Sequence, residues 1–137
     1  MLNSKYEEIN RDDLNVGDVV YVLRYPTFGW AQSFRKPIAV KHVIAKFTPK
    51  RTKITTESGV ELDKNCTLYK MNKDLAKDNE IAKAFQYFCN HNEEITPNLL
   101  RQLSDDTVVS ISKLLREMKT IIEHDEQFIK MQENNKK

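Results

Sequence analysis

The sequence is short of the residues from which loop-built active sites are made. Its 137 residues include only three glycines and four prolines. A glycine-rich phosphate-binding loop needs more glycine than this, so the composition argues against such a site. The two cysteines, Cys66 and Cys89, are too few for a disulfide framework, and we expect both to be reduced.

Long apolar runs are also missing. No stretch of about 18 apolar residues occurs, so no membrane-spanning segment and no membrane partner are expected. The first residues, MLNSKYEEINRDD, are polar and acidic, unlike the apolar core of a secretion signal. These two features predict a cytoplasmic protein, and its length suits one domain or two very small ones.

Acidic residues are absent from one continuous block of the chain. Residues 19–56 contain no Asp or Glu, whereas residues 1–18 and residues 57–137 each carry a net charge of −3. A basic block between acidic flanks indicates an anionic partner more than it indicates a fold. The block contains eight cations: Arg24, Arg35, Lys36, Lys41, Lys46, Lys50, Arg51 and Lys53.

Aromatic residues lie among these cations. Nucleic-acid surfaces combine Lys and Arg, which neutralise phosphates, with rings that stack on bases. We therefore predict that an anionic partner, either nucleic acid or an acidic protein, contacts Trp30, Arg35, Lys36, Lys50, Arg51 and Lys53, with Phe28 and Phe34 as further aromatic contacts. The alternative is a solvated face whose cations pair with acids on neighbouring strands.

The first half of the chain has the two-residue period of β-strands. The stretch DVVYVLRY alternates, and PIAVKHVIAKFT alternates until a shift near Ile44 that predicts a β-bulge. Ser58-Gly59 suits a hairpin turn. Four or five short strands in about 55 residues predict a small closed barrel over residues 14–70, preceded by a segment of residues 1–13.

The second half, residues 72–133, has a helical period. Helices are predicted at about 73–91, 97–103 and 105–132, with Asn72 or Asp74 as the first cap and Thr96-Pro97 as a restart. The fold class is therefore α+β. An apolar seam in the last helix either packs on the helix over 74–90 or forms a homodimer, and it comprises Ile111, Leu115, Met118, Ile122 and Ile129.

No constellation for catalysis is apparent. Cys89 and His91 are two residues apart, but no second pair of metal ligands accompanies them. Adjacent carboxylates such as Asp105 and Asp106 point about 100° apart on a helix, so they do not converge on one substrate. The sequence therefore predicts no metal site, no cofactor and no enzymatic activity.

Two resemblances add to these inferences. LNVGDVVYVLRY, with Val16-Gly17-Asp18 before the first strand, resembles the opening of SH3-like barrels of the Tudor and KOW type, over residues 14–70. A short chain rich in Lys, Asn and Ile, with such a barrel and a helical tail, resembles accessory proteins encoded by bacteriophages. This second resemblance implies an anti-CRISPR-like protein in the cytoplasm of a bacterial host, which binds and inhibits a nucleic-acid-handling or defence complex. The alternative is a direct nucleic-acid-binding regulator with little sequence preference.

Overall fold

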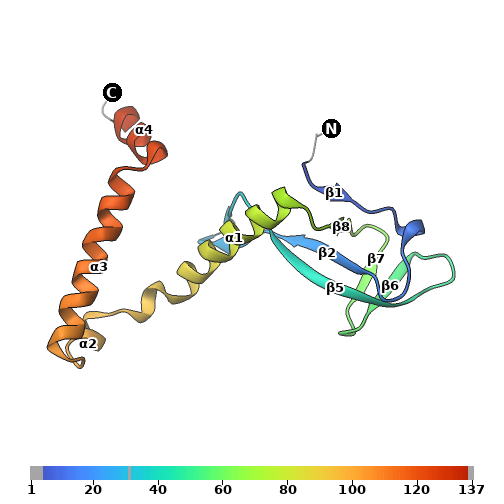
Figure 1. Ribbon diagram of the computed structural model, residues 1–137, viewed down its shortest axis with the longest axis horizontal. Coiled ribbons are helices and arrows are strands. Elements are labelled where there is room, and N and C mark those ends of the chain that lie inside the picture. Colours follow the sequence, from blue (N-terminus) through green and yellow to red (C-terminus); the bar gives the residue numbers. More distant parts are fainter. Residues whose placement is uncertain (1–4, 31, 136–137) are drawn as a thin grey trace. The chain divides into compact units, whose positions relative to one another are not determined.

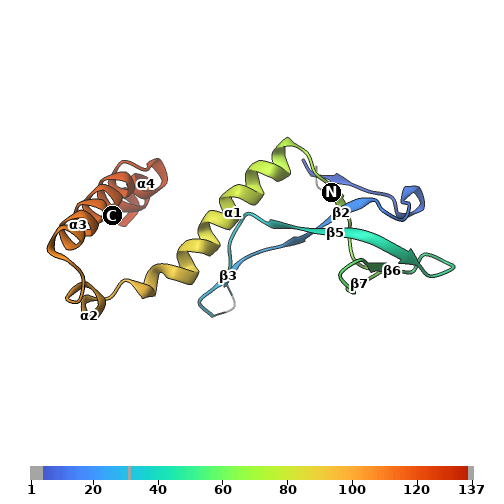
Figure 2. The ribbon, with the colours of Figure 1, turned by 60° about the horizontal axis from the view of Figure 1, so that its bottom comes forward.

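The computed structural model describes residues 5–30 and 32–135 and divides the chain into two compact units, Met1–His91 and Asn92–Lys137. The α+β class is confirmed, with 45% helix and 24% strand among the described residues. The units divide after His91, whereas the sequence predicts a division between residues 70 and 72. The first long helix therefore belongs to the same unit as the strands. In both views the strands and this helix, α1, can be followed through blue, green and yellow (Figures 1 and 2).

Unit 1 is built on an antiparallel sheet. Six strands are ordered β1-β8-β2-β5-β6-β7, and a separate two-stranded hairpin, β3-β4, lies between β2 and β5 in sequence. The strands are β1 (Glu7–Glu8), β2 (Val19–Arg24), β3 (Thr27–Phe28), β4 (Gln32–Ser33), β5 (Ile38–Phe47), β6 (Lys53–Thr56), β7 (Glu61–Asp63) and β8 (Tyr69–Lys70). Among the described residues no pairing joins β7 to β1 or β8, so a closed barrel stays a prediction.

The longest strand, β5, joins the two parts of the sheet. Its first half pairs with β2, and its second half pairs with β6 after a register shift between Ile44 and Lys46. This irregularity confirms the expected bulge, which bends the strand and lets one segment serve both pairings. The β6-β7 hairpin is also found, with Gly59 at a φ of +90° in its turn.

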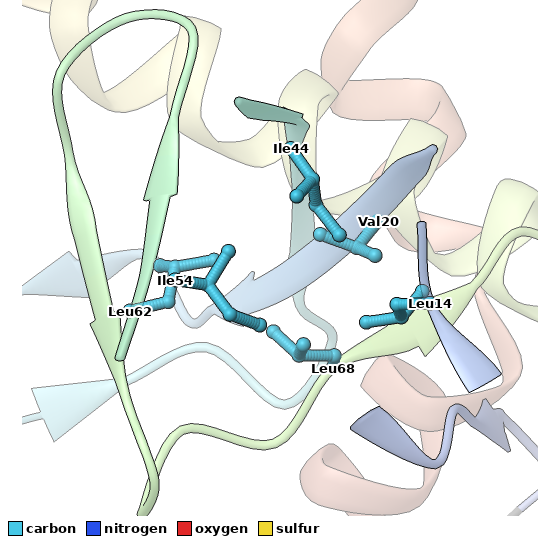
Figure 3. Packing of buried hydrophobic residues seen from close by; sticks show 6 residues of the cluster. All are labelled: Leu14, Val20, Ile44, Ile54, Leu62 and Leu68. Carbon is cyan, nitrogen blue, oxygen red and sulfur yellow. The ribbon is translucent and has the colours of Figure 1, made fainter. Parts of the chain in front are cut away.

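One face of the sheet closes over a small apolar core. Val20, Ile44 and Ile54 have no exposed surface, and each comes from a different strand. Figure 3 shows that these side chains converge with three leucines from the neighbouring segments, Leu14, Leu62 and Leu68. Strand alternation is visible in β6, where Ile54 and Thr56 are both buried, because side chains i and i+2 share a face.

Helix α1 (Lys73–His91) covers part of β5. Asn72 caps its start by accepting a hydrogen bond from the Leu75 N–H at 2.8 Å, as one of the two expected caps. Leu75 and Ala82 are fully buried. The Asn79 side chain accepts a hydrogen bond from the Ala39 N–H at 2.9 Å, which fixes the helix to the start of β5.

Unit 2 consists of α2 (Pro97–Leu100), α3 (Asp105–Glu123) and α4 (Glu126–Asn135), after a short 3-10 turn at Asn92–Glu94. Thr96 caps α2, whose first residue is a proline, as expected. The single helix predicted over 105–132 is instead two helices. Asp125 accepts a hydrogen bond from the Phe128 N–H at 3.0 Å, so it begins α4 instead of continuing the seam, and Ile129 lies on α4.

Among the described residues, no helix is long and apolar enough to cross a membrane.

Candidate binding surface

The basic block does not form one cluster, because β5 separates its members. Lys50 and Lys53 follow the carboxyl end of β5, whereas Trp30, Arg35 and Lys36 precede its amino end. A strand of ten residues spans about 30 Å at roughly 3.3 Å per residue. The six expected contact residues therefore belong to two separate ends of unit 1.

Arg51 supports the fold. Its Nη1 donates hydrogen bonds to the carbonyl oxygens of Arg11 at 2.8 Å and Leu14 at 2.7 Å. Its guanidinium lies over the Phe47 ring, 4.2 Å from the ring centroid. Its φ of +56° is unusual for a residue with a side chain, and these contacts offset the cost of that conformation. Arg51, which the sequence predicts as a contact for the partner, thus anchors the segment before β2.

Lys36 is also engaged, by a buried carboxylate on α1. The Asp78 side chain is 3% exposed and forms ion pairs with Lys36 at 3.3 Å and Lys5 at 3.0 Å. The Tyr6 hydroxyl donates a hydrogen bond to Asp78 at 2.5 Å. Because donors from two separate segments meet one carboxylate, Asp78 ties the N-terminal segment and the loop before β5 to the helix.

The environment of Asp78 favours its charged form. Burial by itself raises the pKa of Asp78, but the hydrogen bonds from Tyr6, Lys5 and Lys36 together hold the pKa below its ordinary value. Burial, followed by the hydrogen bond to Asp78, raises the pKa of Tyr6. The cluster is therefore a negative carboxylate held by a neutral phenol and two ammonium groups.

This arrangement predicts an acid-dependent stability. The pKa of Asp78 is lower in the folded protein than in the unfolded chain, where it is about 4. Its contribution is therefore complete above the unfolded value and is lost as pH falls through the folded value. In urea unfolding from pH 7 down to about pH 2, the stability difference between wild type and Asp78→Asn should shrink below about pH 4. A constant difference would contradict this role.

The two loop phenylalanines anchor the β3-β4 hairpin to α1. Phe34 stacks on Phe85 with ring centroids 4.1 Å apart and planes 9° apart, and Phe28 meets the same ring edge-on at 5.3 Å. Arg35 lies 4.9 Å from the Phe34 ring centroid. The expected aromatic contacts thus serve packing, and Trp30, in the turn that follows β3, is left 94% exposed.

Two shallow depressions flank the base of this hairpin. One, of about 250 Å³, lies beside Arg24, Lys83 and Tyr87, and the other, of about 220 Å³, lies beside Arg24, Pro26 and Phe85. No carboxylate is among the described residues that line either depression. Trp30 and Arg35 line neither depression but belong to the hairpin and its end, and we use the name hairpin surface for Arg24, Trp30, Arg35, Lys83 and Tyr87.

Sequence reasoning missed the part of this surface that α1 supplies. Lys83 and Tyr87 are four residues apart, so they share one side of the helix. Arg24 is one of the cations of the basic block but not one of the six expected contacts, and its Nη2 donates a hydrogen bond to the Gln86 side chain on α1 at 3.1 Å. The sequence shows the i,i+4 spacing of this cation and this aromatic residue. It does not show which face of the helix meets the hairpin.

The described residues offer little for covalent or metal chemistry. No group of three His, Cys, Asp or Glu side chains among them could hold a metal ion. Both cysteines are free thiols, and burial raises the pKa of the Cys66 thiol, which disfavours the reactive thiolate.

Comparison with protein-family models, with curated proteins and with solved structures gives no match to this chain.

Proposed function

We propose that this chain is a non-enzymatic binding protein and that its hairpin surface holds single-stranded nucleic acid. The observation that carries the proposal is Trp30, which is 94% exposed on a hairpin whose base adjoins two depressions. Their described lining includes Arg24 and Lys83 and no carboxylate. A large ring that is not used for packing is suited to stacking on a base. Arg24, Arg35 and Lys83 supply the charge that phosphates require.

The proposal also includes an SH3-like fold for residues 14–70. Strand β5 pairs with β2 in its first half and with β6 in its second half, and β8 returns to β2. Such an arrangement is compatible with an open, SH3-like small barrel, in which one bent strand takes part in two sheets. The resemblance of residues 14–70 to Tudor and KOW barrels supports it further.

The single tryptophan makes the proposal testable without labels. We expect an unlabelled oligothymidylate to quench the fluorescence of Trp30, because a stacked base changes the environment of the indole. Three phosphate contacts predict a slope of log affinity against log salt of about −2 for a single strand, or a loss of roughly 15-fold between 50 and 200 mM. No binding to single or double strands at low salt would exclude the proposal.

Trp30→Ala should reduce affinity about tenfold, because one stacked base contributes roughly 1–3 kcal/mol. Fluorescence anisotropy of a labelled oligonucleotide gives the affinity when the tryptophan is absent. Lys53→Ala is the matched control, since Lys53 is an exposed cation beyond the other end of β5. An equal loss in both variants would place the nucleic acid elsewhere.

A second candidate is an inhibitor that docks on an acidic face of a host nucleic-acid-handling complex. The composition of the hairpin surface favours it, because Trp, Tyr and Arg dominate protein–protein hot spots and Tyr87 is 68% exposed. Capture from a bacterial lysate separates the candidates. A protein complex that stays bound after nuclease treatment and is lost with Trp30→Ala supports the inhibitor, and loss on nuclease treatment supports the nucleic-acid binder.

A further inference from the structure

Helix α3 carries an apolar stripe that the described residues of unit 2 leave uncovered. None of the described residues of α3 is buried, and Leu114 and Ile121 are 58% and 70% exposed. Steps of three and four residues place the stripe on one face of the helix. Its members are Ile111, Leu114, Leu115, Met118, Ile121 and Ile122. An apolar face of this width needs a partner.

We propose that the partner is a second copy of this chain, whose α3 packs antiparallel against the first. A two-fold axis between residues 116 and 117 places Ile111 opposite Ile122 of the second copy and Leu115 opposite Met118 of the second copy. Each seam position then meets an apolar side chain. The helix contains both halves of its own interface, and this self-complementarity favours a second copy over an unrelated protein.

The residues beside the seam favour the antiparallel direction. In an antiparallel pair, the flank that carries Leu114 and Ile121 faces the same flank of the second helix. Leu114 therefore lies beside Ile121 of the second copy. On the other flank Lys119 lies beside Ser112 of the second copy, so no like charges face each other along the seam. A parallel pair would set the apolar flank against the flank of Ser112 and Lys119. The antiparallel pair therefore buries more apolar surface.

Helix α3 offers a long surface for a dimer contact. Helix α3 has 19 residues and is about 28 Å long at roughly 1.5 Å per residue. Two further apolar side chains on α4, Ile129 and Met131, are 43% and 58% exposed and extend the apolar surface of unit 2. Ile129, an expected seam residue, contributes from α4.

Sedimentation equilibrium of the full chain tests the dimer. We expect a dimer at about 100 µM and at least a 100-fold weaker association for Leu115→Glu, which places a charge in the seam. Val109→Glu is the matched control, because Val109 is 68% exposed and lies on the opposite face of α3. A monomeric wild type, or equal weakening by both variants, would overturn the proposal.

Disulfide trapping tests the direction. In a variant with Cys66 and Cys89 replaced by alanine, Ile111→Cys mixed with Ile122→Cys should form a cross-link between the two chains, because bridged Cα atoms must lie within about 7 Å. Either variant alone should remain uncross-linked. Efficient self-cross-linking of both single variants would show a parallel pair and overturn the proposed register.

Discussion

Asp78→Ala should lower the free energy of unfolding by about 3 kcal/mol, because removing one partner of a buried ion pair leaves the others uncompensated. Three segments lose a common anchor at once: Lys5 and Tyr6 before the sheet, Lys36 before β5, and α1 itself. The expected loss lies at the lower end of the range for buried pairs, because Lys5 and Lys36 reach solvent and are rehydrated in the variant.

Equilibrium unfolding in urea, followed by far-ultraviolet circular dichroism, measures this loss. Glu80→Ala is the matched control, because it removes an exposed carboxylate from the same helix and should change stability by less than about 0.5 kcal/mol. If the two variants unfold at the same urea concentration, Asp78 does not anchor these segments.

Arg51→Met should cost about 2–3 kcal/mol of stability and leave the affinity for single strands unchanged. Methionine keeps much of the apolar stem of arginine, but it has no guanidinium to lie over Phe47 or to donate to the Arg11 and Leu14 carbonyls. A hydrogen bond from a charged donor contributes more than a neutral one, and the abandoned carbonyls are partly buried. The segment that leads into β2 therefore loses its attachment.

Lys50→Met is the control for this experiment, since it removes the neighbouring exposed cation. Thermal unfolding and the oligonucleotide titration are measured on both variants. A stable Arg51→Met protein with weakened binding would show that Arg51 contacts the nucleic acid and would contradict its structural role.

The expected mode of action depended on a single basic cluster, and the tertiary structure divides that cluster. The block of eight cations is visible in the sequence, but charge composition does not report the distance between its members. One strand of ten residues separates the two groups. The part at the hairpin gains Lys83 from α1, and this contribution moves the candidate surface away from Lys50 and Lys53.

Local features of this protein were set by the sequence alone. The alternation of β2, the bulge of β5, the caps at Asn72 and Thr96 and the helical seam follow from interactions within a few residues, which a pattern can report. The helix break at Asp125 also results from a local interaction. However, an aspartate among regularly spaced apolar residues is equally consistent with a polar seam residue and with a helix cap.

Only the tertiary structure decided which side chains are free to bind. Arg51 reaches a carbonyl oxygen 37 residues away, and Lys36 finds its carboxylate on a helix that follows the whole sheet. Those pairings depend on which face of α1 covers β5 and on where the chain before β2 returns. Such contacts between distant segments leave no periodic trace in the sequence, so the candidate surface can be located only in the folded chain.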